Sequence, residues 1–336
     1  MNESRTMKEK LQLLFLAVIF VFSINCAIVF IPNIFPQKAS LSEVKVVKSK
    51  KFLVRNKILI IDINGIISCV DDDSLFGLGR ENTVEEVKDR LLKAEKDPNI
   101  RAVILRLNSP GGEVTSSDII YQELKKYKEK TGVKIVACLM DLGTSGAYYI
   151  AVSADKIIAH PTSITGSIGV ITQLFNVKKL ADKLGIDFIA IKSDEKKDMG
   201  SLFRYLTDEE KKIFQNLIDT MFNRFIDVVD EGRATLTREE IRTLADGRVF
   251  TAKEALEKKL IDQIGYMDDA IELAKKEAGI KDANVIFYKR GREYKGNIYS
   301  RSEVSFLKPQ INLININIGE LLSYSRPQFF YIWNPN

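Results

Sequence analysis

The fold of this chain is decided by the stretch GTSGAYYI at residues 143–150. It places Ser145 among small residues, where a helix is expected to begin. The first backbone N–H groups of a helix have no intrahelical partner, so they can face an oxygen that develops negative charge. Ser145 is therefore a candidate nucleophile. The chain has a single histidine, His160, which sits beside Pro161 only fifteen residues after Ser145. A Ser-His-Asp triad therefore has almost no candidate histidine, and lysine is the remaining candidate base.

On both sides of this stretch, apolar runs alternate with amphipathic ones. Residues 58–63 and 102–107 are short, rich in branched side chains and nearly continuous, as expected for strands buried on both faces. Further strands are expected at residues 134–140, 156–159 and 186–191. Such alternation with helices predicts an α/β fold with a mostly parallel sheet covered by helices.

Helix starts are marked by Thr-x-x-Glu capping boxes. These pair Thr83 with Glu86, Thr207 with Glu210, Thr237 with Glu240, and Thr251 with Glu254. Another helix is expected to begin near Ser116 or Ser117. From residue 207 the chain is mainly helical, and the apolar stripe of the first helix there would face either the core or a subunit interface.

The N-terminal region contains a candidate membrane span. Residues 11–31 form a run of 21 without a charged side chain, which matches the ~20 residues that cross a bilayer as a helix. A removable signal peptide is the alternative, but the run is long and has no small-x-small cleavage site. The basic residues nearest the span favour an N-terminus inside the cell. A wider count of basic residues does not favour this orientation, because it includes the lysines of a linker at residues 36–51.

Composition excludes some classes of function. The 336 residues carry a net charge of +5, and the lysines are mixed with acidic residues, so nucleic-acid binding has no support. The cysteines, Cys26, Cys69 and Cys138, offer no paired framework. The length allows two domains or one larger α/β domain with extensions.

Three further segments are individually weak signals. NSPGG at residues 108–112 and TGSIGV at 165–170 could be ordinary turns, although the paired glycines of the first leave amides free to approach a ligand. The charged run at 192–198 is typical of a solvated loop. No periodicity argument selects one of its lysines.

Taken in order, however, six motifs resemble those of the signal peptide peptidase A family of membrane-anchored Ser-Lys peptidases, over roughly residues 58–265. They are SPGG at 109–112, SGAYYIA at 145–151, ADKI at 154–157, TGSIGV at 165–170, KDMGS at 197–201 and ADGRVF at 245–250. The resemblance implies a Clp protease/crotonase-like fold. It also implies a homo-oligomeric ring in which neighbouring subunits share an active site.

The resemblance also assigns roles to residues. Ser145 would be the nucleophile and Lys197 the general base, with the Ser167 hydroxyl orienting the dyad. A free lysine has a pKa of ~10.4, so Lys197 would have to be held neutral by desolvation or a nearby cation. The amides of Gly112 and Gly146 would form the oxyanion hole.

A peptide substrate would lie extended beside Gly111, Glu113 and Val114, adding a strand by backbone hydrogen bonding. Two departures from the family pattern bear on activity. Ala147 stands where the family usually has glycine, and Lys196 directly precedes Lys197, although the KDMGS register favours Lys197. Arg204 resembles a family position, where a salt bridge or a helix-start contact is the expected role.

The resulting division of the chain is a cytoplasmic N-terminus at 1–10, a transmembrane anchor at 11–31 in contact with lipid, a linker at 32–57, a Ser-Lys peptidase domain at 58–275 and a C-terminal extension at 276–336. The protein would lie in the cell membrane as a single-pass protein with its catalytic domain on the extracytoplasmic side. The last ~25 residues could dock on a neighbour, occupy a binding groove or be disordered.

The predicted function is that of a serine endopeptidase. It would hydrolyse remnant signal peptides and other membrane-associated peptides, with no cofactor and no metal. Two alternatives on the same fold remain: a catalytically inactive membrane scaffold, and an acyl-binding protein that uses a comparable oxyanion hole on thioesters.

Overall fold

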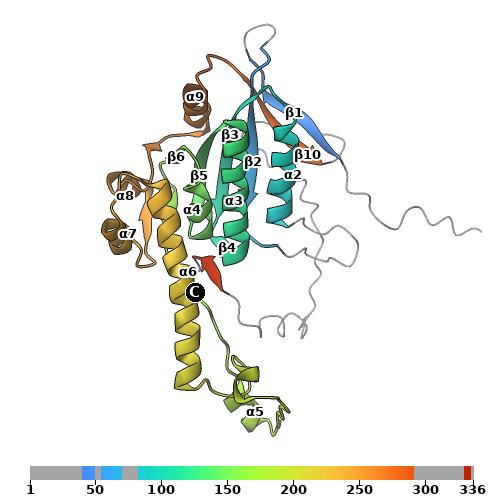
Figure 1. Ribbon diagram of the computed structural model, residues 1–336, viewed down its shortest axis with the longest axis vertical. Helices are drawn as coiled ribbons and strands as arrows, with labels where there is room; N and C mark the ends of the chain where they lie inside the picture. Colours follow the sequence, from blue (N-terminus) through green and yellow to red (C-terminus); the bar gives the residue numbers. More distant parts are fainter. Residues whose placement is uncertain (1–39, 50–53, 70–81, 291–328, 334–336) are drawn as a thin grey trace, which may run out of the picture. The chain divides into compact units, whose positions relative to one another are not determined.

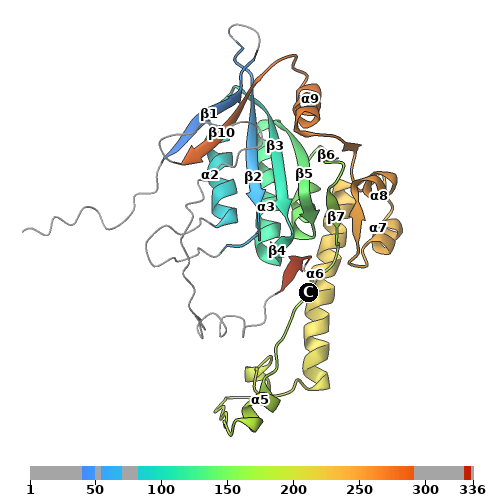
Figure 2. The ribbon, with the colours of Figure 1, turned by 180° about the vertical axis from the view of Figure 1, so that it is seen from behind.

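A mostly parallel sheet forms the centre of the protein, as the sequence predicts. The computed structural model describes residues 40–49, 54–69, 82–290 and 329–333. Nine strands follow the order β1-β10-β2-β3-β5-β6-β9, with β7 paired to β5 and β8 to β7 (Figures 1 and 2). Only β1 with β10 and β8 with β7 are antiparallel in this sheet. The strands are β1 (Leu41–Val47), β2 (Lys57–Asn64), β3 (Ile100–Ser109), β5 (Lys134–Thr144), β6 (Lys156–Ala159), β7 (Ile164–Gly166), β8 (Val249–Thr251), β9 (Gln263–Ile264) and β10 (Asn284–Arg290).

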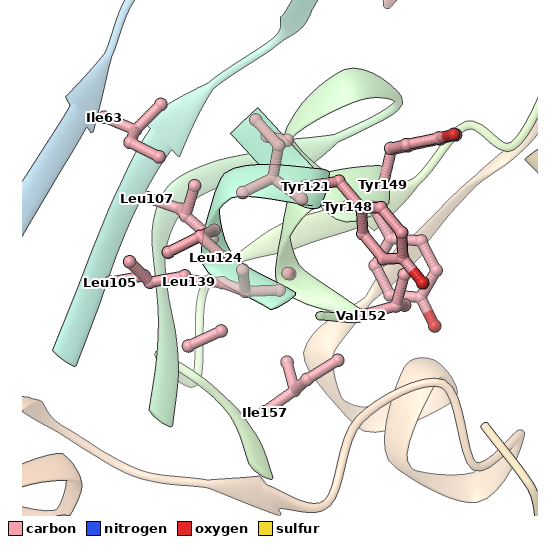
Figure 3. Packing of buried hydrophobic residues seen from close by; sticks show 14 of the residues in the cluster. Ile63, Leu105, Leu107, Tyr121, Leu124, Leu139, Tyr148, Tyr149, Val152 and Ile157 are labelled. Carbon is pink, nitrogen blue, oxygen red and sulfur yellow. The ribbon is translucent and has the colours of Figure 1, made fainter. Parts of the chain in front are cut away.

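The central strands are continuously apolar because helices cover both faces of the sheet. On β2, Leu59 and Ile61 belong to a core cluster with α2 (Thr83–Glu95), α3 (Val114–Thr131) and α4 (Gly146–Ala151). Their neighbours Ile58 and Ile60 instead pack with α9 (Met267–Glu277). Side chains alternate along a strand, so each face receives every second residue. Figure 3 shows the first cluster, where Leu105 and Leu139 of the sheet meet Leu124 of α3 and the tyrosines of α4.

Three of the four predicted capping boxes are confirmed. They begin α6 (Asp208–Gly232), α7 (Arg238–Leu244) and α8 (Ala252–Glu257). The box predicted at Thr83 and Glu86 is wrong by one residue. Asn82 is the N-cap of α2, and its side-chain oxygen accepts from the Glu85 amide at 2.6 Å. Asparagine and threonine both cap well, and the geometry of the chain entering α2 selects the first of them.

Two further predictions are corrected. α3 begins at Val114 rather than near Ser116 or Ser117, because both serine hydroxyls donate back to Glu113 from within the first turn, that of Ser117 to its carbonyl at 2.9 Å. The expected strand at residues 186–191 does not form. Its apolar side chains are exposed, with Ile191 98% accessible, because no neighbouring strand pairs with this segment among the described residues.

The sheet also draws on segments outside residues 58–275, since β1 lies in the predicted linker and β10 in the predicted C-terminal extension. The domain limits themselves stay a prediction. The predicted span at 11–31 falls outside the described residues. Among the helices that are described, none is both long and apolar enough to cross a membrane.

Candidate active site

Ser145 lies at the carboxyl end of β5 in a strained conformation. Its φ of 52° and ψ of −116° are unfavourable for a residue with a Cβ, and such strain costs about 1–3 kcal/mol. The amide of Ser145 donates to the Gly166 carbonyl at 2.7 Å, and its carbonyl accepts from the Tyr149 amide at 2.8 Å. The residue is only 1% exposed. Surrounding contacts therefore impose a costly geometry on Ser145, as is common at functional sites.

The two glycine segments meet backbone to backbone beside Ser145. β4 (Gly111–Glu113) follows β3, and Gly111 has a φ of 102° that favours glycine. A Cβ placed on Gly111 would lie 2.7 Å from the Gly146 nitrogen. A Cβ on Gly146 would lie 3.2 Å from the Gly112 nitrogen and 2.5 Å from the Ser117 hydroxyl. The structure thus brings the backbones of Gly112 and Gly146 together beside Ser145.

Ser167 is brought to the same place by strand pairing. β7 runs parallel to β5 with Thr144 opposite Gly166, so the residues that follow each strand are neighbours. Ser167 is buried, has a φ of 51° and donates its amide to the Arg248 carbonyl at 2.8 Å. Two strained serines therefore flank the same pair of strand ends.

Lys197 lies elsewhere in the same chain. It belongs to the 3-10 helix η1 (Glu195–Asp198), within a segment at residues 172–206 that also carries α5 (Lys178–Lys183) and that we call the arm. Figures 1 and 2 place α5 beyond the end of α6 that lies away from the sheet, whereas α4 lies against the sheet. Lys197 is exposed. The structure therefore does not bring it to Ser145 within one chain.

The neighbouring lysines are engaged in ion pairs. Lys192 contacts the Asp198 carboxylate at 2.7 Å, and Lys196 contacts that of Glu209 at 3.0 Å, which raises the pKa of Lys196 and makes it a poorer base. For Lys197, no ion pair or side-chain hydrogen bond is found with any residue that the structure describes. Of these three amines, that of Lys197 is the one available for another partner.

Arg204 fixes the arm to α6. Its guanidinium contacts Asp198 at 2.8 Å and Glu210 at 2.5 Å. These hydrogen bonds hold the pKa of Asp198 well below its usual range and lower the pKa of Glu210 to about 2. Glu210 also receives the Thr207 amide as part of the capping box. The expected salt bridge and helix-start contact of Arg204 are thus confirmed together.

An extended segment of the chain's own C-terminus lies beside the predicted substrate-binding residues. β11 (Phe330–Ile332) pairs antiparallel with β4, with Tyr331 opposite Gly112 (Figure 1). On its other edge, the Phe330 amide and carbonyl bond to Ile171 at 2.9 and 3.0 Å. Glu113 contributes only backbone to this pairing. Burial opposes ionisation of its carboxylate, but hydrogen bonds from Ser116 and the Cys69 amide outweigh that and lower its pKa.

Sequence reasoning missed a group of aromatic and charged side chains that includes Tyr149 of α4, the helix that Ser145 precedes. The Tyr149 hydroxyl donates to Asp118 at 2.5 Å, and the Arg224 guanidinium contacts the same carboxylate at 2.9 Å. The available signal was spacing, since Tyr149 follows Ser145 by four residues, and its amide donates to the Ser145 carbonyl. Ala147, the departure noted above, is fully buried in the core cluster that includes α4, which accommodates its methyl group.

A parallel α/β sheet that presents a strained serine beside two closely packed glycine amides defines a serine hydrolase of the Clp protease type. The families described as Peptidase family S49 and Clp protease match residues 127–281 and 75–166. The chain belongs to peptidase family S49 and is a serine peptidase.

Named relatives agree with this assignment. The chain is 34% identical over 283 residues to "Putative signal peptide peptidase SppA" of Enterococcus faecium, covering 82% of this chain and 81% of that protein. It is 33% identical over 222 residues to Protease 4 of Haemophilus influenzae, covering 66% and 35% of the two chains. Identity to the chloroplastic serine protease SPPA of Arabidopsis thaliana is 32% over 231 residues, or 67% and 33%.

Proposed function

We propose that this peptidase uses Ser145 as nucleophile and Lys197 as general base to hydrolyse remnant signal peptides and other membrane-associated peptides. The observation that carries the proposal is the strained, buried Ser145 beside Gly112 and Gly146, with an extended strand already lying along β4. The name of the relative from Enterococcus faecium supports the class of substrate.

The chemistry follows from the geometry. The Ser145 hydroxyl attacks the substrate carbonyl and loses its proton to the Lys197 amine. The negative oxygen that forms accepts hydrogen bonds from the Gly112 and Gly146 amides, each worth ~3 kcal/mol if aimed at that oxygen. The protonated amine then supplies the proton that the leaving amine takes up. Water hydrolyses the acyl-enzyme in the reverse sequence, and Ser167 would orient the lysine throughout.

Lys197 would reach Ser145 from a neighbouring copy of the chain in a ring. The arm that carries Lys197 lies apart from its own Ser145, and its amine has no partner among the described residues. The arm also exposes many large apolar side chains, which is typical of an interaction surface. They are Phe175, Leu180, Leu184, Ile186, Phe188, Ile189 and Ile191.

The membrane placement completes the proposal. Residues 11–31 would anchor the chain in the cell membrane, with 1–10 in the cytoplasm, 32–57 as a linker and the peptidase domain on the extracytoplasmic side. Peptides left in the bilayer would then lie in the same membrane that holds the peptidase. The segment 276–336 would extend the peptidase domain rather than form another.

The test is cleavage of a quenched apolar peptide by the full-length protein in detergent, together with fluorophosphonate labelling. The wild-type protein should cleave the peptide and react with the fluorophosphonate. Ser145→Ala and Lys197→Ala should each lose both cleavage and labelling. Lys196→Ala is the matched control and should retain cleavage. A wild-type protein that assembles but neither cleaves nor labels would favour the scaffold or acyl-binding alternatives.

A further inference from the structure

The segment that carries one proposed oxyanion donor has almost no side chains of its own to hold it. Two of the three residues of β4, Gly111 and Gly112, are glycines, and the third is Glu113. Glycine loses more conformational freedom on folding than any other residue. The direction of the Gly112 amide must therefore be fixed by the contacts that neighbouring segments make with β4.

One edge of β4 is paired with the segment at residues 65–69. The Ile67 amide donates to the Gly111 carbonyl at 3.0 Å, and the Glu113 amide donates to the Ile67 carbonyl at 2.8 Å. Along a strand, the N–H and C=O groups of successive residues point to opposite edges. Gly112 lies between these two residues, so its amide points away from Ile67 and toward the edge where the proposed oxyanion forms.

The backbones of Gly112 and Ile67 are also in direct contact. A Cβ placed on Gly112 would lie 2.0 Å from the Ile67 carbonyl oxygen and 2.5 Å from the Ile67 nitrogen, so only glycine fits here. Ile67 itself is fully buried. Movement of residues 65–69 relative to β4 would therefore displace the Gly112 backbone and turn its amide.

The Glu113 carboxylate joins residues 68 and 69 to the first turn of α3. Its Oε2 accepts from the Ser116 hydroxyl at 2.6 Å and from the Cys69 amide at 3.0 Å, and its Oε1 accepts from the Ser68 hydroxyl at 3.3 Å. Hydrogen bonds to a charged acceptor are roughly twice as strong as neutral ones. Because Ser116 is fully buried within α3, it provides a fixed point for this group.

We propose that Glu113 is a positioning residue, whose carboxylate holds residues 67–69 against β4 and so aims the Gly112 amide at the oxyanion. It acts through Gly112 and takes no part in bond making or proton transfer. The proposal rests on the proposed function and adds a residue to it. This role belongs to the Glu113 side chain, whereas the substrate-binding role expected from the sequence uses its backbone.

The first experiment measures steady-state cleavage of a quenched apolar peptide by the full-length protein in detergent. Glu113→Ala should lower kcat about 10- to 100-fold and leave KM within about twofold, because a misdirected donor costs less than a lost one. Glu123→Ala is the matched control, since Glu123 lies on the same helix and pairs with Lys88 of α2 instead. A normal kcat in Glu113→Ala, or an equal fall in Glu123→Ala, would overturn the proposal.

The second experiment tests the hydrogen bonds themselves. Glu113→Gln should keep kcat within about 3-fold of the wild-type value, because its amide oxygen has two lone pairs and can accept from both Ser116 and Cys69. Ser116→Ala should lower kcat less than Glu113→Ala does, and the double variant should be no slower than Glu113→Ala alone. Losses that add in the double variant would show that Ser116 does not act through the carboxylate.

Hydrogen exchange separates this proposal from the proposed function, because it needs no catalysis. In the full-length Ser145→Ala protein, adding Glu113→Ala should raise exchange at residues 65–69 and 111–114, and adding Glu123→Ala should not. Unchanged exchange, or faster exchange in an enzyme whose kcat is normal, would refute the positioning role. If the wild-type protein cleaves no peptide, the proposed function fails, and exchange alone decides whether Glu113 holds β4.

Discussion

The amide of Ser145 donates to the carbonyl of Gly166 at 2.7 Å, and this single bond ties the candidate nucleophile to the motif that carries Ser167. β5 and β7 end at this bond, so the two serine motifs form one structural unit. The bond also helps to hold Ser145 at its positive φ. Tertiary contacts therefore maintain the strained backbone of Ser145. A substitution that relieves this strain tests it.

Replacing Ser145 by glycine should stabilise the fold relative to alanine while both changes abolish cleavage. Glycine adopts a φ of 52° without strain, whereas alanine retains a cost of about 1–3 kcal/mol. Thermal unfolding measures the difference. Ser153, which is buried and not at positive φ, supplies the control pair, and there glycine should be the less stable substitution. The same order at both positions would contradict the strain at Ser145.

Gly146→Ala should lower kcat about 10²- to 10³-fold, the usual cost of losing one oxyanion donor. Its Cβ would lie 2.5 Å from the Ser117 hydroxyl and 3.2 Å from the Gly112 nitrogen, so the start of α4 must shift. Gly169→Ala is the control, because its Cβ would meet nothing closer than 3.6 Å. Steady-state kinetics of both variants measure the effect on kcat. A normal kcat in Gly146→Ala would show that the Gly146 amide is not an oxyanion donor.

Mixing two inactive variants should restore activity if the dyad forms between copies. Ser145→Ala and Lys197→Ala, unfolded and reassembled together in equal amounts, would pair an intact Ser145 with an intact Lys197 at about a quarter of the interfaces of a ring. Peptide cleavage by the mixture is compared with that of each variant reassembled alone. If Lys197 acted within its own chain, the mixture would stay as inactive as its components.

Attachment of the arm should weaken in acid. Glu210 has a folded pKa of about 2, set first by Arg204, which lies below its unfolded value of ~4.5. Its contribution to stability is therefore present above about pH 4.5 and is lost as the pH falls toward 2. Hydrogen exchange of residues 192–206 should rise across this window.

Arg204→Gln should raise exchange in the arm already at neutral pH and flatten the acid dependence. Arg248→Gln is the control, because Arg248 pairs only with the nearby exposed Asp246 among the described residues. An arm whose exchange is independent of Arg204 would show that apolar contacts, rather than this ion pair, hold it to α6.

Local sequence patterns determined much of the fold. The apolar runs of β2, β3 and β5 and the capping boxes before α6, α7 and α8 were readable because each depends on residues within a few positions of one another. Ser145 was singled out for the same reason, as a serine among small residues at a helix start. Local patterns were not sufficient for the cap of α2 or for the strand expected at 186–191. Local preference did not decide which residue caps α2 or whether residues 186–191 form a strand.

Tertiary structure alone decided which distant segments meet. Nothing local in residues 330–332 predicts pairing with residues 111–113, and nothing local in Lys197 shows that it lies apart from Ser145 in its own chain. Both depend on backbone hydrogen bonds and packing between residues far apart in sequence, which side-chain periodicity does not encode. The sequence by itself thus determined most of the elements and the candidate nucleophile, and the tertiary structure decided which distant strand pairs with β4 beside it.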